Sequence, residues 1–161
     1  MLNREGIAGR IPHRGSMCLL ERVVFWNAEG IECEAGSHRD ADNPLRAFGR
    51  LGIAAGIEYA AQAMAVHGAL AGEAAGLPGA AARAGYLASV RSVRLHAARL
   101  DDVPDALQVH AMRLMGDENN IVYSFALKAG QRPLLEGRAT VVLDASLALR
   151  TNAAAGAGAQ I

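Results

Sequence analysis

The stretch IAAGIEYAAQAMAVHGAL, residues 53–70, decides the fold. It is rich in alanine and apolar on nearly every side, which predicts a helix surrounded by other parts of the protein rather than one lying on its surface. Glu58, Gln62 and His67 interrupt the apolar run of residues 53–71. These polar residues make the run a poor membrane span and a good buried helix, so we expect no membrane partner.

Strand patterns flank this helix on both sides. Residues 17–26 form a β-rich run, and residues 31–35 alternate apolar and polar after a short turn, which is typical of a hairpin. Further strand-like runs follow the helix, and the polar turns between them suit an antiparallel meander. They cover residues 86–95, 107–114, 121–128 and 134–143. The predicted fold class is therefore α+β, with an antiparallel β-sheet wrapped around a long central α-helix.

The chain of 161 residues fits a single domain over residues 1–149. A tail rich in alanine and glycine, residues 150–161, is expected to be disordered, and residues 72–84 read as a loop. The 16 basic and 16 acidic residues balance, so the composition gives no reason to expect a nucleic acid partner. The N-terminus lacks the apolar segment of a secretory signal, and we expect a cytoplasmic protein.

The residues that commonly hold metals and cofactors do not form a pattern. Two cysteines, Cys18 and Cys33, and five scattered histidines lack the spacing of a metal site. The sequence also lacks the phosphate-loop, dinucleotide-binding and nucleophilic-serine motifs. We therefore expect neither a metal nor an organic cofactor.

Glu58 is the strongest candidate for chemistry, because it is a carboxylate in an otherwise apolar helix. Such a group must be paired, hydrogen-bonded or protonated, unless it reaches solvent near the start of the helix. Gln62 lies one turn later on the same face, where it either orients Glu58 or substrate or is an ordinary buried amide. Gly56 either admits a substrate carbonyl to backbone N–H groups or permits close helix–sheet packing.

Several short motifs follow one another in a consistent order. They are IPHR at residues 11–14, LLERV at 19–23, EYAAQ at 58–62, GYLASV at 85–90 and LEGRAT at 135–140. In these motifs the chain resembles the hotdog-fold β-hydroxyacyl-acyl carrier protein dehydratases. Residues 56–68, together with DNPLR at residues 42–46, resemble a divergent branch of predicted dehydratases. Some members of that branch are encoded with aryl-polyene-type lipid pathways, and a subunit can pair with a different hotdog protein.

The resemblance implies dehydration of a 3-hydroxyacyl thioester on acyl carrier protein to the 2-enoyl thioester, without a metal or redox cofactor. A neutral histidine would remove the proton next to the thioester, and Glu58 would protonate the departing hydroxyl. However, the family's Gly-His-Phe-Pro-Gly motif is missing, and Pro44 stands fourteen residues before Glu58, where its histidine would be. The catalytic histidine cannot be assigned by that motif.

Two other histidines are candidates for this role. His38 precedes the helix in the region where the family places its base, or it is a solvated loop residue. His13 lies in the Pro-His-Arg match, an element that is usually structural in the family. His67 is nine residues after Glu58 and faces away from it, so a satisfied core or interface histidine is the better interpretation.

Two alternatives to a dehydratase stay open. Hotdog acyl thioesterases use a helix carboxylate and need no histidine. The chain could also be a non-catalytic or half-site subunit of a hotdog heterodimer. In every case a sheet wrapped around one helix leaves strand edges unpaired, so we expect a homodimer or a heterodimer with another hotdog subunit.

Overall fold

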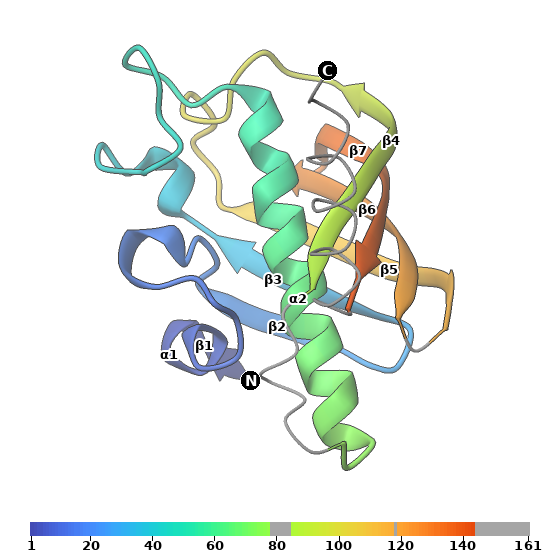
Figure 1. Cartoon of the computed structure of the whole chain (residues 1–161). Coiled ribbons are helices and arrows are strands. Elements are labelled where there is room, and N and C mark those ends of the chain that lie inside the picture. Colours follow the sequence, from blue (N-terminus) through green and yellow to red (C-terminus); the bar gives the residue numbers. More distant parts are fainter. Residues whose placement is uncertain (78–84, 118, 144–161) are drawn as a thin grey trace, which may run out of the picture.

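The structure, a computed structural model, describes residues 1–77, 85–117 and 119–143. One seven-stranded sheet lies against one long helix (Figure 1). The elements are β1 Leu2–Asn3, α1 Arg4–Ala8, β2 Arg22–Trp26, β3 Gly30–Ala35, α2 Gly56–Ala74, β4 Tyr86–Leu95, β5 Leu107–Gly116, β6 Asn120–Ala129 and β7 Arg132–Val142.

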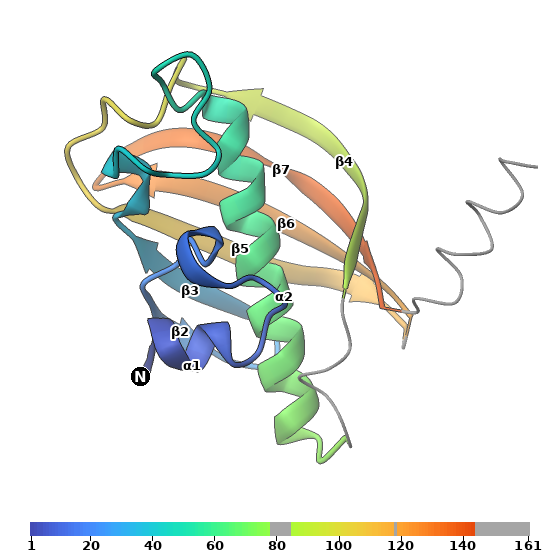
Figure 2. The same cartoon turned by 60° about the vertical axis from the view of Figure 1, so that its left-hand side comes forward.

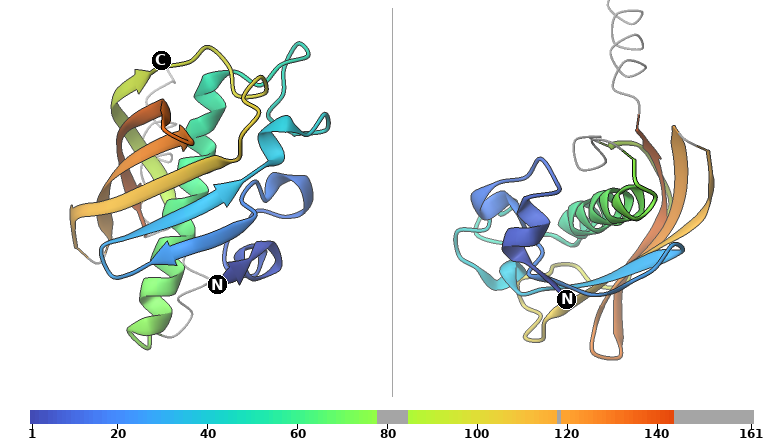
Figure 3. Two further views of the ribbon diagram at one scale, coloured as in Figure 1. Left: turned by 180° about the vertical axis from the view of Figure 1, so that it is seen from behind. Right: turned by 90° about the horizontal axis from the view of Figure 1, so that it is seen from below.

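The sheet has the order β1-β2-β3-β5-β6-β7-β4, and every neighbouring pair is antiparallel. The predicted hairpin is β2–β3, and the last three strands form the predicted meander. The first strand after the helix, β4, is separated from β5: it pairs with β7 at the edge, while β3 pairs with β5. The sheet curves around α2 (Figures 2 and 3), which confirms the hotdog fold.

The central helix begins at Gly56, after a 3₁₀ turn over Ile53–Ala55, and ends at Ala74. It therefore takes up the start of the segment that we predicted as a loop over residues 72–84, since the small residues there continue the helix. Residues 78–84 of that segment and the predicted tail over residues 150–161 lie outside the described residues.

The two sides of α2 differ in burial. Tyr59, Ala60, Ala63 and Val66 are all fully buried and belong to the core shared with the sheet. The opposite side, which includes Glu58, Ala61, Ala65 and Gly68, is half-buried. The helix is thus apolar all round, as predicted, but one side of it is only partly covered by the described part of this chain.

Gly56 packs against side chains of the sheet. A Cβ added there would lie 2.7 Å from Leu135 Cδ2 and 2.9 Å from Leu127 Cδ2. Both leucines are buried, on β7 and β6, so neither has free space into which to move. Of the two uses that the sequence suggested for this glycine, the packing one therefore has direct geometric support.

We expect Gly56→Ala to destabilise the fold, even though alanine is the better helix former. Overpacking a closed core typically costs about 1–3 kcal/mol, whereas the gain in helix propensity is about 1 kcal/mol. The free energy of unfolding, measured in urea, should fall. An equal or higher value would mean that the two leucines move aside freely.

The sheet has one long open edge. β4 pairs only with β7, and its other side has no strand partner among the described residues. Tyr86, Leu87 and Leu95 on this strand are 46%, 41% and 53% exposed. Within the described residues, no helix is both long and apolar enough to cross a membrane.

Candidate active site

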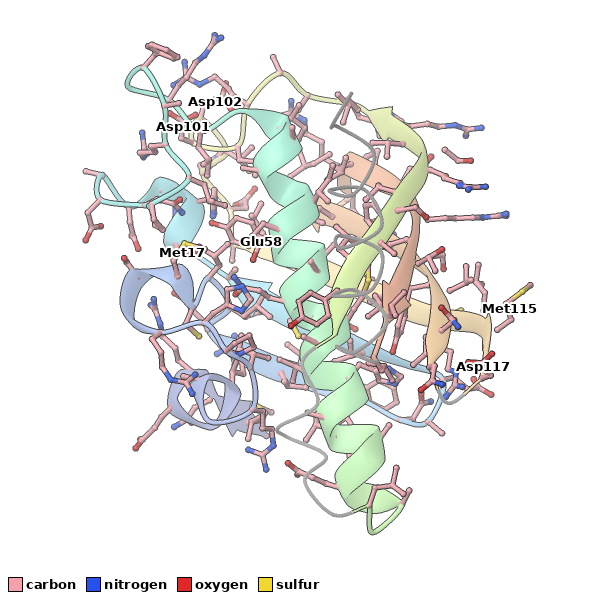
Figure 4. The ribbon with its side chains drawn as sticks, in the orientation of Figure 1. Met17, Glu58, Asp101, Asp102, Met115 and Asp117 are labelled. Carbon is pink, nitrogen blue, oxygen red and sulfur yellow. The ribbon has the colours of Figure 1, made fainter. Side chains whose placement is uncertain are left out.

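Glu58 and His13 meet at the N-terminal end of α2. Glu58 stands in the first turn of the helix, on the side that faces the N-terminal segment (Figure 4). Its Oε1 lies 3.0 Å from Nε2 of His13, and the two side chains keep 32% and 28% of their surface exposed. Within the described residues, both side chains are therefore partly open to solvent.

Gln62 holds Glu58 and the loop before β2 together. Its Nε2 donates to Glu58 Oε1 at 2.9 Å and to the Met17 carbonyl at 2.8 Å. Its Oε1 accepts from the Leu19 backbone N–H at 2.9 Å. The amide is fully buried, and its two ends are distinguished by these partners. The i, i+4 spacing predicted the contact with Glu58, but it did not predict the contacts with the loop.

The loop that carries His13 is fixed by the neighbouring Arg14. Its guanidinium donates to the carbonyls of Ala8, Ile11 and His13. Nδ1 of His13 is buried and has no hydrogen-bond partner among the described residues. The imidazole is thus held through Nε2, by its contact with Glu58.

His38, the other candidate, is placed differently. Its side chain is fully buried, and Nε2 lies 3.0 Å from the Val103 carbonyl. Because a carbonyl only accepts, Nε2 carries the proton, and burial lowers the pKa of the imidazole. Within the described residues, no hydrogen bond or ion pair joins His38 to Glu58. The alternative prediction of a solvated loop residue is wrong, because the 3₁₀ turn Ser37–Arg39 directs this side chain inward.

A buried polar cluster surrounds the same turn. The Tyr59 hydroxyl lies 2.9 Å from Ser37 Oγ and accepts from Asn43 Nδ2 at 3.0 Å. Asn43 Nδ2 also donates to the Ser37 carbonyl. Burial raises the pKa of Tyr59, so the phenol stays neutral. These bonds tie the segment before α2 to the helix, which is a positioning role.

His67 lies on the buried side of α2. Its Nδ1 is 2.9 Å from the Tyr123 hydroxyl and its Nε2 is 2.9 Å from the Asn27 carbonyl. The side chain is 1% exposed, and burial lowers the pKa of His67. Both nitrogens are satisfied, as the helical phase predicted. The described residues contain no group of three or more metal-ligating side chains.

With this geometry established, comparisons with known proteins assign the family. The ApeP-like family model, described as ApeP dehydratase, matches residues 6–150. The chain belongs to the ApeP-like dehydratase family. A search of curated protein sequences finds no significant match.

Solved structures support the fold of this ApeP-like chain. The dehydratase heterocomplex ApeI:P from Xenorhabdus doucetiae is similar with a TM-score of 0.76 and 21% identity, over 90% of this chain and 95% of that one. A hypothetical thioesterase with coenzyme A from Streptococcus pneumoniae has a TM-score of 0.55 and 11% identity, over 76% and 84%. The hotdog fold is therefore shared by dehydratases and thioesterases, and the assignment as a dehydratase comes from the family model.

Proposed function

We propose that this chain dehydrates a 3-hydroxyacyl thioester carried on acyl carrier protein to the 2-enoyl thioester, with His13 and Glu58 as the acid–base pair. The observation that supports this most directly is the 3.0 Å contact between His13 Nε2 and Glu58 Oε1 at the partly exposed start of α2. A base and an acid within reach of one substrate are what removal of water requires.

In the proposed reaction the pair holds one exchangeable proton, on Glu58, and the imidazole is neutral. His13 takes the proton from the carbon next to the thioester carbonyl, and Glu58 gives its proton to the 3-hydroxyl. The carbon–oxygen bond breaks, the double bond forms and water leaves. The proton on His13 then passes across the 3.0 Å contact to the carboxylate, which restores both groups. The positive end of the α2 dipole favours the developing negative charge on the thioester oxygen.

We further propose that the chain acts together with a second hotdog subunit. The open side of β4, which has no strand partner among the described residues, lies beside the exposed Tyr86 and Leu87, and an added strand would cover it. The same partner would cover the half-covered side of α2. It would also lower the exposed fractions of His13 and Glu58. The similar structure from Xenorhabdus doucetiae is a heterocomplex, which supports a different chain as the partner.

The test is product analysis by mass spectrometry, with a 3-hydroxyacyl chain loaded on acyl carrier protein. The chain is assayed alone and after co-purification with a second hotdog subunit. Loss of one water from the loaded carrier supports the proposal, while free acid and free thiol would identify a thioesterase. Turnover by the complex that is unchanged when Glu58 of this chain is replaced by glutamine would arise in the partner and would identify this chain as a non-catalytic subunit.

A further inference from the structure

Phe48 stands at the tip of a tight turn in the segment between β3 and α2. Ala47 and Arg50 form an antiparallel bridge around it. The Ala47 N–H donates to the Arg50 carbonyl at 2.9 Å, and the Arg50 N–H donates to the Ala47 carbonyl at 3.1 Å. Between them, Phe48 and Gly49 have φ values of +52° and +74°. Positive φ at both central residues is typical of a type I′ turn.

The turn itself gives no reason for a phenylalanine at this position. A type I′ turn favours Asn, Asp or Gly at its first central residue, and a positive φ is an outlier for a bulky side chain. The Phe48 side chain is also fully exposed, so burial against the described part of this chain does not compensate for the backbone strain. A residue that is both strained and exposed points to a role outside its own chain.

The segments on both sides of the turn are held in place. Before it, the Arg46 guanidinium donates to Asp101 Oδ2 at 3.2 Å and to the Asp40 carbonyl at 2.7 Å, and the Asp101 side chain is only 5% exposed. After it, Leu51 is fully buried, and its carbonyl accepts from the Leu100 N–H at 2.8 Å. The ring is thus presented on an ordered support, and little conformational freedom is lost when a partner binds it.

The turn lies at the same end of the molecule as the start of α2 and the end of β4 (Figures 1 and 2). The N–H of Ile53, just before the helix, donates to the carbonyl of Ala98, three residues after β4 ends at Leu95. The support of the turn is therefore connected to the strand whose other side has no partner among the described residues. A subunit that adds to β4 is placed close to this end of the molecule.

The exposed charges in the segments that support the turn are of both signs. They are Arg39, Asp40, Asp42, Arg50 and Asp102. A polar rim around one large aromatic side chain is typical of the anchor points of protein–protein interfaces. A surface for an anionic group, such as the phosphodiester of a carrier's pantetheine arm, would instead gather cations. The surroundings of Phe48 therefore favour another folded subunit over the carrier.

We propose that Phe48 is an aromatic anchor that inserts into an apolar pocket of the second hotdog subunit. This inference rests on the pairing proposed above. The similar structure from Xenorhabdus doucetiae is a heterocomplex, which favours a different chain over a second copy of this one. A buried aromatic anchor commonly supplies a large part of the affinity of an interface.

The test compares the wild type with Phe48→Asn and Phe48→Ala, each co-purified with the second hotdog subunit and diluted for mass photometry. Asparagine before Gly49 is a preferred pair for this turn, whereas alanine removes the ring and keeps a Cβ in the same strained backbone. We expect both variants to raise the dissociation constant of the complex about 10–100-fold, the effect of losing the burial of one phenyl ring.

Phe25→Thr is the matched control. Phe25 is an exposed aromatic residue on β2, and four strands separate β2 from β4 in the sheet. Threonine suits a strand, so the dissociation constant of this variant should equal that of the wild type. An equal weakening in Phe25→Thr would show a general effect of removing exposed aromatic residues and would overturn the specific role of Phe48.

Two further measurements separate this role from others. The urea midpoint of Phe48→Asn, measured on this chain alone, should be equal to that of the wild type or higher, because the strain is relieved. A lower midpoint would mean that the ring stabilises its own chain, and would overturn the proposal. A raised KM for the loaded carrier, beside a dissociation constant equal to that of the wild type, would assign Phe48 to the carrier and overturn it as well.

The outcomes also distinguish this inference from the proposed function. Equal dissociation constants in all four proteins would overturn the role of Phe48 and leave the pairing intact. A wild type that forms no complex with the second subunit would remove the pairing and this inference together. If the complex weakens as expected in both Phe48 variants while the wild-type complex dehydrates no thioester, the anchor is supported and only the proposed reaction is lost.

Discussion

Glu58→Gln abolishes dehydration and leaves the fold intact: this is the first of the two largest effects that we expect. The amide has nearly the same volume, and its oxygen, in the place of Glu58 Oε1, can still accept from Gln62 Nε2 and from an Nε2–H of His13. It has no acidic proton to give to the leaving hydroxyl. Removing a general acid typically costs about 10²–10⁴-fold in rate, measured as enoyl product from the loaded carrier.

Glu73→Gln is the matched control for this change. Glu73 is a carboxylate on the same helix, but it is exposed and pairs with Arg10 at 3.0 Å. An exposed ion pair contributes about 0–1 kcal/mol, so the variant should keep both its rate and its stability. Wild-type turnover by a folded Glu58→Gln protein would remove Glu58 from the mechanism.

The second large effect concerns the two histidines. His13→Ala should lower the rate by about 10²–10⁴-fold and change stability little, because the side chain is 28% exposed and its one polar contact within the described residues is with Glu58. His38→Ala should act in the opposite way. It empties a fully buried position and leaves the Val103 carbonyl without a donor, at a cost of about 1–3 kcal/mol in unfolding free energy.

Urea unfolding and initial rates, measured on both variants, separate the two roles. His13→Gln adds a useful comparison, since the amide can donate to Glu58 but cannot act as a base near neutral pH. A folded His38→Ala protein of normal stability and low turnover, beside an active His13→Ala, would reverse the assignment.

The helix and its neighbours were predictable from the sequence because their signals are local. An apolar run interrupted by only three polar residues indicates a buried helix, and alternation beside a short turn indicates a hairpin. The position of β4 was not predictable in this way. It depends on pairing with β7 through a register in which Tyr86 lies opposite Val142, and no local pattern specifies a partner so distant along the chain.

The same contrast between local and distant signals applies to the residues of the candidate site. Glu58 and Gln62 are one turn apart, so their contact follows from helix geometry alone. His13 is separated from Glu58 by forty-five residues, and its position depends on a loop held by Arg14 and by Gln62. The Pro-His-Arg motif was the only sign of this histidine in the sequence, and it resembles an element that is usually structural.

The amide of Gln62 has a consequence for how this protein can change over time. Its NH₂ end must face Glu58 and Met17, and its oxygen must face Leu19. Glutamate could not supply the donors, and a shorter asparagine could not span the same distance. Substitution of Gln62 is therefore expected only where the loop from residue 11 to residue 19 changes its path at the same time. We therefore expect the two segments to vary together among related sequences, although they are more than forty residues apart in the chain.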